Sequence, residues 1–563
     1  MTIAERFRRF VPAPFACGPW IFLAVAVYLE TQAGFTALRG DLAEADPPAH
    51  FTTGVMLHDF VRFGNFIRPL PFAECFYVQY PKVALGHWPP VFYILEALWF
   101  FIFGTTTSAA RWLCACIAGS CALLLYRRCR IDWGRWHGVA AAALFLALPV
   151  VQHQTWRVMS DLLCAGLSFV AICSLSDYLT SGKLKDGLWL VAWASLAILT
   201  KGTAWLLLVP IAAGPLFTGR KSFYAAWRYW LAISLVCIVS APFFVLMSAL
   251  GLGYPLGAAT YIHLLAVILQ RLPFSQLVAG GLVVVLIAAA LYRWLPRAPL
   301  RQVQTRNVLF ALWVATLVGF IELVPLTPER DRYFLMALAP AAYLLAGAMV
   351  TIERRLEWFR YVELFAVLSC AAILALVPVH LASTTSFSDA MRVIPIGRGP
   401  QVILLEGDEV GEGAMIAARL TEDQARSSYL VRGTKFLATS DWSGARYSLN
   451  YKTLEALRAA MDGIRLDYIV LDTSAPPKPD VLLMKEVLAD PASKWEVMAH
   501  IPLSLRSRRG ELLVYQRESQ GGLPVVPASV RLSPDRGAKK LVCEALQGAT
   551  SGQPKASDGK GGD

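Results

Sequence analysis

The chain of 563 residues has few charged side chains. Only 16% of its residues are Asp, Glu, Lys or Arg, whereas soluble globular proteins carry about a quarter. Hydrophobic residues make up 56% of the sequence, and the mean hydropathy is +0.50. Such a shortage of charge requires long segments that never meet water. It excludes disordered and collagen-like classes and predicts a polytopic α-helical membrane protein.

Paired cysteine spacings and internal repeats are also lacking. The 11 cysteines show neither metal-ligand nor disulfide-framework spacing, and we interpret them as small core residues. The net charge is +12 and the pI is near 9.2. In a membrane protein the first explanation of such a balance is basic cytoplasmic loops, so no nucleic-acid partner is expected.

Apolar segments of the length that crosses a bilayer recur along the first two thirds of the chain. A spanning helix needs roughly 17 to 25 apolar residues, and we expect eleven spans, three of them short. They cover 13–33, 108–126, 137–152, 161–179, 186–200, 202–218, 228–249, 276–294, 307–325, 333–351 and 359–380. Residues 89–104 are also apolar, but this segment has only 16 residues. It forms either a twelfth span or an interfacial helix.

The distribution of Lys and Arg decides between these alternatives. If 89–104 does not cross, nineteen basic residues fall in cytoplasmic connections and five in short outer loops, which satisfies the positive-inside rule. The five outer residues are Arg157, Lys201, Arg271, Arg330 and Arg332. We therefore expect an interfacial or re-entrant segment at 89–104, an uncleaved first helix with the N-terminus in the cytoplasm, and a C-terminal region outside it, at the plasma membrane.

The composition changes after residue 382. We expect a membrane domain over 1–382 with an outer loop at 34–107, a small extracytoplasmic α/β domain over 383–520, and a disordered tail over 521–563. Four apolar runs predict strands and Thr453–Met461 predicts a helix; the runs are 402–405, 429–431, 468–471 and 512–515. A glycine-rich segment, 407–413, lacks the spacing of a nucleotide-binding loop and is interpreted as a structural turn.

Mixed acids, imidazoles and cations gather in the outer loops, where acid/base chemistry beside an anionic leaving group could occur. Asp46 followed by Pro47 has the form of a helix start, and the helix would place Phe51, Val55 and Met56 on one apolar face. His50 follows Asp46 by one turn. Asp46 is thus either a functional carboxylate at the membrane surface or simply a helix cap.

Other outer residues allow similar pairs of interpretations. Asp161 begins a span as a functional acid or as a cap paired with Arg157, and Lys201 between two spans either binds an anion or snorkels to the interface. The stretch 80–90, which contains Lys82, His87 and Trp88, is either a contact loop or part of an aromatic belt.

Residues 328–333 place four charges before a late span, either as an internal ion-pair cluster or as a phosphate-binding fork. We favour the fork. A divalent metal is conceivable, but no residue spacing resembles a known site, so no metal ligands are assigned. The sequence therefore does not decide whether the protein uses a divalent metal as a cofactor.

The order of these motifs resembles that of the GT-C superfamily of membrane glycosyltransferases, in particular the bacterial branch with the lipid A aminoarabinose transferases and the protein O-mannosyltransferases. The matching features are an acidic motif on a juxtamembrane helix, a Pro-Pro motif, Arg-x-Met-x-Asp, Thr-Lys-Gly and Arg-Tyr before a late span. They run from residue 13 to about 380.

The resemblance implies inverting transfer of a sugar from a polyprenyl-phosphate carrier to a lipid, glycan or protein acceptor at the outer leaflet. Asp46 takes the place of the first-loop catalytic aspartate and Asp161 that of the second acidic residue. Substrate-binding roles fall to His50, Lys82, His87, Arg157, Lys201, Arg330, Arg332 and Tyr333.

The sequence departs from the pattern of the superfamily at two positions. Pro47 stands where the family has the second acid of an Asp-Glu pair, and Trp88 stands where Lys or His precedes Pro-Pro. Two rival functions remain: a transporter or flippase of a lipid-linked glycan, and an inactive glycosyltransferase-like scaffold. The sequence names neither the sugar nor the acceptor.

Overall fold

The computed structural model describes residues 40–63, 68–84, 86–250, 301–323, 330–353, 384–397, 399–439, 447–464, 466–474, 478–505, 508–518, 529–531 and 540–543. The chain divides into two compact units. The helical unit comprises 1–38, 86–96 and 108–381, and the mixed unit comprises 39–85, 97–107 and 382–563. Each unit is described by itself.

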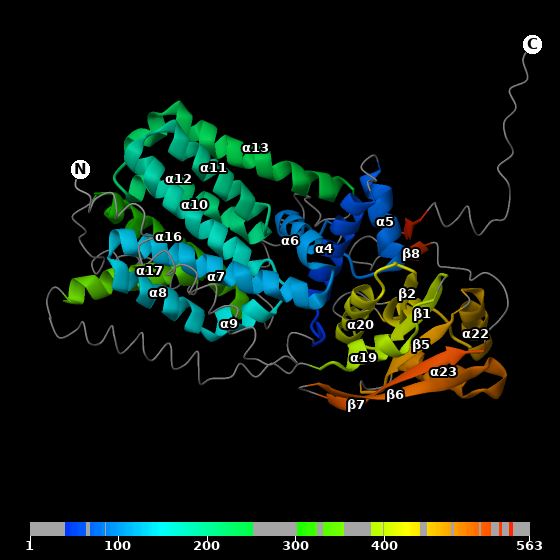
Figure 1. The fold of residues 1–563 in the computed structure, drawn as a ribbon. Helices are drawn as coiled ribbons and strands as arrows, with labels where there is room; N and C mark the ends of the chain where they lie inside the picture. Colours follow the sequence, from blue (N-terminus) through cyan, green and yellow to red (C-terminus); the bar gives the residue numbers. More distant parts are fainter. Residues whose placement is uncertain are drawn as a thin grey trace, which may run out of the picture. The chain divides into compact units, whose positions relative to one another are not determined.

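The helical unit is a bundle of apolar helices (Figure 1). Its described helices are α7 (Thr107–Asp132), α8 (Arg135–Ala147), α9 (Pro149–Trp156), α10 (Asp161–Ser181), α11 (Leu184–Ile198), η1 (Gly202–Leu207), α12 (Leu208–Phe217), η2 (Lys221–Ala225), α13 (Trp227–Ala249), α16 (Arg301–Leu323), η3 (Arg330–Phe334) and α17 (Leu335–Glu353).

Every expected span that falls on described residues is helical. Among the described residues, five helices are long and apolar enough to cross a membrane, and the bent pair α8 and α9, with an angle of 63° between them, would make a sixth. α11 and the η1–α12 segment occupy the expected spans 186–200 and 202–218. Both are shorter than each of the five long helices. The expected spans 13–33, 276–294 and 359–380 lie outside the described residues. The fold class is therefore confirmed as polytopic and α-helical, while the total of eleven spans stays a prediction.

The Pro-Pro segment leads into α6 (Val91–Phe103), which has 13 residues. At 1.5 Å per residue it is about 20 Å long, which is short of a hydrocarbon core about 30 Å thick. It ends at Gly104, whose φ of +81° lies in the left-handed region that glycine adopts freely. This length agrees with a segment that does not cross.

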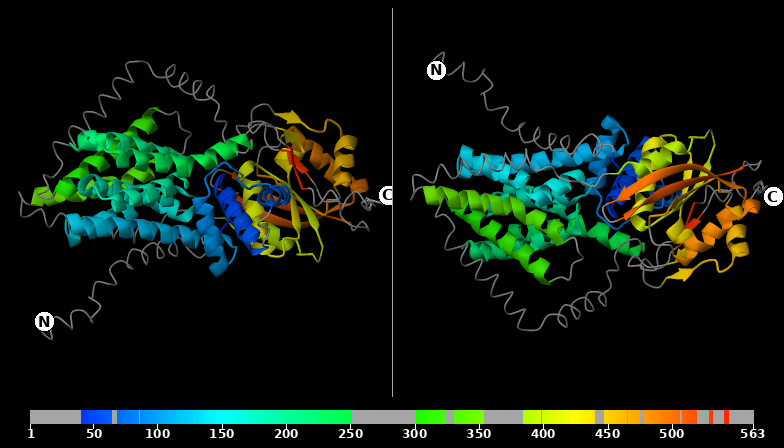
Figure 2. Two further views of the ribbon diagram at one scale, coloured as in Figure 1. Left: turned by 90° about the horizontal axis from the view of Figure 1, so that it is seen from above. Right: turned by 90° about the horizontal axis from the view of Figure 1, so that it is seen from below.

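The mixed unit contains a five-stranded sheet with strand order β2-β1-β5-β7-β6. β1 (Gln401–Glu406) pairs in parallel with β2 (Ser428–Arg432) and β5 (Tyr468–Asp472), and β7 (Arg508–Arg517) pairs antiparallel with β5 and with β6 (Trp495–Leu505). All four apolar runs named from the sequence lie in these strands. The long β6–β7 hairpin forms one side of the sheet (Figure 2).

Helices cover both faces of the sheet. On one face α22 (Leu454–Gly463) and α23 (Pro479–Ala489) bury Leu457, Met461 and Met484 against alternate strand residues such as Val402 and Leu404. α19 (Ser386–Val393) contacts β6 and β7, and α20 (Glu409–Glu422) contacts β1 and β2. The helix predicted over 453–461 is α22, and the Thr453 side chain caps it by accepting from the Ala456 amide. The expected α/β domain is thus present.

The outer loop folds together with this domain. α4 (Pro47–Arg62) contacts α20, and α5 (Pro69–Gln79) contacts β2 and β9. The boundary that we drew at residue 383 therefore separates segments that pack as one unit, because packing between distant stretches is not visible in composition.

Part of the predicted disordered tail is ordered, which corrects the prediction for 529–531 and 540–543. β8 (Ser529–Arg531) and β9 (Lys540–Val542) form an antiparallel pair, and Cys543 makes a disulfide with Cys75 on α5. The interpretation of all cysteines as core residues was therefore wrong for these two, whose pairing spans 468 residues. Five other described cysteines, Cys121, Cys129, Cys164, Cys173 and Cys237, are free thiols.

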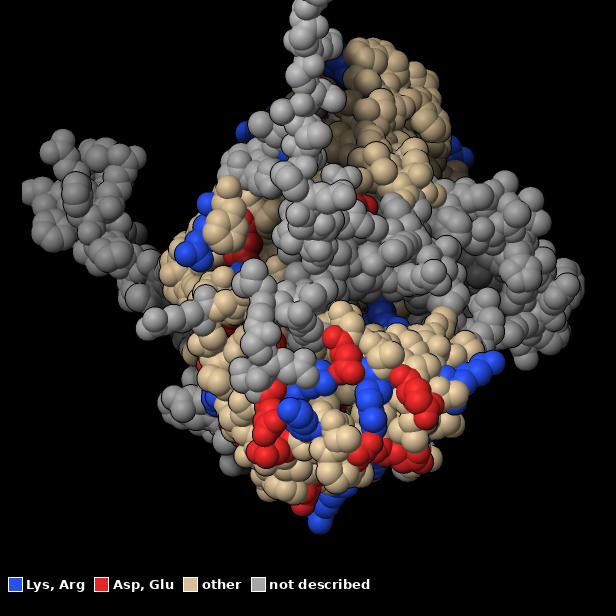
Figure 3. Space-filling view, turned by 90° about the vertical axis from the view of Figure 1, so that its right-hand side faces the viewer, with Lys and Arg blue, Asp and Glu red and all other residues tan. Residues whose placement is uncertain are grey.

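The face of the molecule in Figure 3 shows acidic and basic side chains interspersed over the C-terminal domain. Exposed or half-exposed ion pairs of this domain include Arg458–Asp490 and Lys494–Glu518. Alternating charge of this kind keeps a surface soluble and favours no highly charged macromolecular partner.

Candidate functional site

Asp46 lies where the sequence predicts, at the start of α4 in the mixed unit. Pro47 occupies the first helical turn, yet the Asp46 side chain makes no capping hydrogen bond to the helix. The helix is held by other means, since Thr52 and Thr53 donate to carbonyls one turn back and its inner residues are buried. The Asp46 carboxylate therefore does not act as the cap of α4.

Two candidate binding residues lie in the same unit. His50 is buried in the first part of α4. Lys82 is also buried, with Nζ 3.4 Å from the carbonyl oxygen of Glu409 and 3.5 Å from its Oε1. Burial, aided by the nearby Arg432 guanidinium, lowers the pKa of Lys82 to about 8.

In the helical unit, Asp161, Lys201 and Tyr333 come together. Asp161 is the first residue of α10, Lys201 lies between α11 and η1, and Tyr333 lies in η3. Lys201 Nζ is 2.5 Å from Asp161 Oδ1 and 5.2 Å from the Tyr333 ring centroid, and the two charged residues are buried. The structure thus gathers three of the predicted site residues into one cluster, in which the Lys201 ammonium pairs with the Asp161 carboxylate.

Arginine adds charge to this cluster. The Arg332 guanidinium lies 5.5 Å from the Tyr333 ring centroid, so Lys201 and Arg332 both contact the same aromatic ring. Arg157 follows α9, a helix that contacts both α10 and η3. The side chain of Arg330 lies outside the described residues. The expected fork at 328–333 is thus described only for Arg332.

His87 belongs to the helical unit, and its ring meets Trp88 edge-on with centroids 4.5 Å apart. The next element, α6, joins the bundle through a hydrogen bond from the Val91 amide to the Leu199 carbonyl, two residues before Lys201. The Pro-Pro segment and the Lys201 segment are therefore neighbours.

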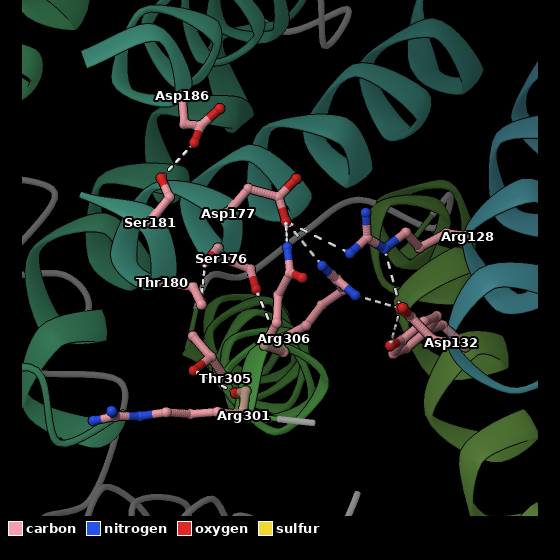
Figure 4. Close-up of polar contacts among 12 residues, drawn as sticks. Arg128, Asp132, Ser176, Asp177, Thr180, Ser181, Asp186, Arg301, Thr305 and Arg306 are labelled. Atoms are coloured by element: carbon pink, nitrogen blue, oxygen red, sulfur yellow. Dashed lines mark hydrogen bonds and ion pairs between the residues drawn. The ribbon is translucent and has the colours of Figure 1, made fainter. Parts of the chain in front are cut away.

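A second charged network occupies the opposite end of α10. Arg306 is fully buried and bonds to both Asp132 and Asp177, which Arg128 also contacts, and the Tyr343 hydroxyl donates to Asp132 (Figure 4). Asp161 and Asp177 are about 24 Å apart along the helix at 1.5 Å per residue. The charges thus form separate clusters at the two ends of the bundle, as expected for helices that span an apolar layer.

This second network was missed from the sequence, where Arg128 and Arg306 were counted only as cytoplasmic charge. The sequence did contain a signal for this network. Asp132 and Asp177 each lie near the end of an expected span, with basic residues close to them in the sequence. Within the described residues, no three His, Cys, Asp or Glu side chains are arranged to hold a metal ion.

Chemically, the Lys201 cluster offers the buried Lys201 ammonium, the Tyr333 ring and a second cation, the Arg332 guanidinium. Such a group can bind a phosphate at the end of a membrane helix bundle. Asp46 and Lys82 belong to the mixed unit and the cluster belongs to the helical unit, so the arrangement of each set is described within its own unit.

Residues 87–245 match the family model for dolichyl-phosphate-mannose-protein mannosyltransferase. The structure is similar to that of ArnT from Cupriavidus metallidurans in the apo state, with 13% identity, a TM-score of 0.54 and coverage of 90% of this chain and 100% of that chain. The chain has the GT-C fold of membrane glycosyltransferases. The superfamily predicted from the order of motifs is confirmed.

The same ArnT bound to undecaprenyl phosphate gives 13% identity, a TM-score of 0.51 and coverage of 89% of this GT-C chain and 98% of that chain. By sequence, no curated protein matches. At 13% identity the similarity establishes the shared fold. The roles of individual residues in this GT-C glycosyltransferase stay predictions.

Proposed function

We propose that this GT-C glycosyltransferase transfers a sugar, with inversion, from a polyprenyl-phosphate carrier to an acceptor hydroxyl at the outer face of the plasma membrane. The observation that carries the proposal is the buried Lys201 cluster with Tyr333 and Arg332 at one end of the helix bundle. The phosphate of a lipid carrier lies at the membrane surface, close to the ends of spanning helices, and its charge needs a cationic partner there. Undecaprenyl phosphate, the ligand in one of the similar ArnT structures, is of this class.

In the proposed reaction Asp46 accepts the proton of the acceptor hydroxyl while that oxygen attacks the anomeric carbon. The bond from the anomeric carbon to the phosphate oxygen breaks, and Lys201 and Arg332 stabilise the negative charge that develops on the carrier phosphate. Asp161 keeps the Lys201 ammonium in position. A single displacement of this kind inverts the anomeric centre.

The disulfide supports the assignment of the outer face. Cys75 belongs to the first outer loop and Cys543 to the C-terminal region, both of which the positive-inside rule places outside the cytoplasm. Disulfides persist in oxidising compartments and are rare in the cytosol. A bond between these two cysteines therefore supports one extracytoplasmic location for both segments.

The proposal is tested with the purified full-length protein in lipid nanodiscs, supplied with radiolabelled undecaprenyl-phosphate sugars and a panel of lipid, glycan and peptide acceptors. The expected result is a labelled product whose anomeric configuration is opposite to that of the donor. A product with retained configuration would reject the single displacement. Movement of the lipid-linked sugar across liposomes without transfer would instead establish the flippase.

A further inference from the structure

We propose that the C-terminal domain positions Asp46, and that Asp41 and Gly413 are the residues through which it does so. This inference rests on the proposed function, in which Asp46 is the base. All the contacts that carry it lie within the mixed unit. They hold the chain on both sides of Asp46.

On the N-terminal side, Asp41 joins the loop to the start of α19. Its backbone amide donates to the Thr384 carbonyl at 2.7 Å, and its carboxylate accepts from the amides of Phe387 at 2.8 Å and Ser388 at 2.9 Å. The Ser388 hydroxyl donates to the same carboxylate. Asp41 thus serves α19 as a capping residue supplied from a segment more than three hundred residues earlier.

On the C-terminal side, the first turn of α4 lies against α20. A Cβ added to Gly413 would be 3.2 Å from Pro48 Cγ and 2.9 Å from Lys82 Cε. Glycine inside a helix is less favourable than alanine, and this close approach accounts for its presence. Pro48 follows Asp46 by only two residues, so any displacement there is passed to Asp46 almost directly.

Further contacts fix the direction of α4. Asp59, near its end, bonds to Arg426 of the C-terminal domain at 2.7 Å, and both side chains are buried. The remaining Arg426 nitrogens donate to the Leu420 and Asp423 carbonyls and to the Thr105 hydroxyl. A buried ion pair is weak evidence for net stability, and we assign this one the role of orienting α4.

The helix that starts at Asp46 is therefore anchored before its start, at its first turn and at its last turn. A general base must stay within hydrogen-bond reach of the proton that it removes, and a displacement of about 1 Å can cost a hundredfold in rate. This assigns the domain a positioning role in addition to any contact with the acceptor.

The experiment compares kcat and KM for the donor among wild type, Asp46→Asn, Asp41→Asn and Gly413→Ala, all as full-length protein in nanodiscs. The matched control is Asp490→Asn, because Asp490 caps η4 (Pro491–Ser493) in the same domain by accepting from the Ala492 amide at 2.8 Å. We expect Asp41→Asn and Gly413→Ala to lower kcat about ten- to a hundredfold with little change in KM, and the control to leave both unchanged.

A double variant separates positioning from general damage. If Asp41 acts through Asp46, Asp41→Asn adds little to the loss already caused by Asp46→Asn. An equal further loss in the Asp46→Asn background, or a rise in KM at constant kcat, would overturn the positioning role. If Asp41→Asn does not fold, Gly413→Ala carries the comparison.

The outcomes distinguish this inference from the proposed function. Wild-type kcat in both positioning variants, beside an inactive Asp46→Asn, would reject the inference and leave the function intact. Full activity in Asp46→Asn, or no transfer by wild type, would reject both.

Discussion

Lys201 Nζ lies 2.5 Å from Asp161 Oδ1, and the other oxygen of that carboxylate, Oδ2, is buried without a hydrogen-bond partner among the described residues. The two residues are forty positions apart and come from different helical segments. Asp161 thus holds the ammonium of Lys201 beneath the Tyr333 ring. In the proposed function this pair presents the Lys201 ammonium to the carrier phosphate.

Lys201→Met is expected to raise KM for the polyprenyl-phosphate donor at least tenfold and to destabilise the protein by about 3 kcal/mol or more, because Asp161 is left buried and unpaired. The double variant Lys201→Met, Asp161→Asn should recover most of the unfolding temperature but not the donor affinity. Thermal unfolding and donor titration measure the two effects. Unchanged donor affinity in Lys201→Met would remove Lys201 from the phosphate site.

Removing one member of the buried pair Asp59–Arg426 is expected to destabilise the mixed unit. Arg426→Met leaves the Asp59 carboxylate without its cation and should lower the free energy of unfolding by about 3 kcal/mol. The control is Lys494→Met, whose exposed pair with Glu518 is worth less than about 1 kcal/mol. Limited proteolysis of the C-terminal domain reports the difference, and equal protection of both variants would show that the pair is dispensable.

Stability should rise with pH through Lys82. Burial lowers the pKa of Lys82 to about 8 in the folded chain, against 10.5 for the free side chain. Between these values the unfolded chain binds the proton that the folded chain has released, so raising the pH favours folding. The difference corresponds to about 3 kcal/mol.

Lys82→Met removes this pH dependence. We expect the unfolding temperature of wild type, relative to the variant, to increase between pH 8 and 10.5 and to stay constant below pH 8. Parallel curves for the two proteins over the whole range would show that Lys82 keeps its ordinary pKa. Gly463→Ala, a change with no neighbour within 4 Å, controls for the effect of substitution itself.

The disulfide predicts a covalent link between α5 and the C-terminal tail. After cleavage of the chain between Cys75 and Cys543, the two fragments should remain joined on a nonreducing gel and separate with reductant. Cys75→Ser should abolish the link and, by freeing a closed loop of several hundred residues, destabilise the unit by about 2 to 5 kcal/mol. Alkylation of both thiols in protein never exposed to reductant would argue against an oxidising location.

Local patterns predicted local structure well. The strands at 402–405 and 468–471, the helix α22 and the start of α4 after Asp46 followed from apolar patterning and turn chemistry over a few residues. Apolar length likewise placed α10 and α13. In these cases the residues that carry the sequence pattern are the same residues that form the helix or strand.

Long-range pairs could not be predicted in the same way. Cys75–Cys543, Asp59–Arg426 and Asp161–Lys201 join segments from forty to several hundred residues apart. The sequence showed charged residues in the right loops, and Arg157 was the partner considered for Asp161. Which residues meet depends on packing of the whole chain, which spacing does not encode.

The most direct measurement is sugar transfer by wild type and Asp46→Asn in nanodiscs, with thermal unfolding confirming that both are folded. If Asp46 is the base, the variant binds the donor with unchanged affinity and loses about a hundred- to ten-thousandfold in kcat. If Asp46→Asn keeps the wild-type kcat, the assignment of Asp46 is wrong, and with it the mechanism proposed for this chain.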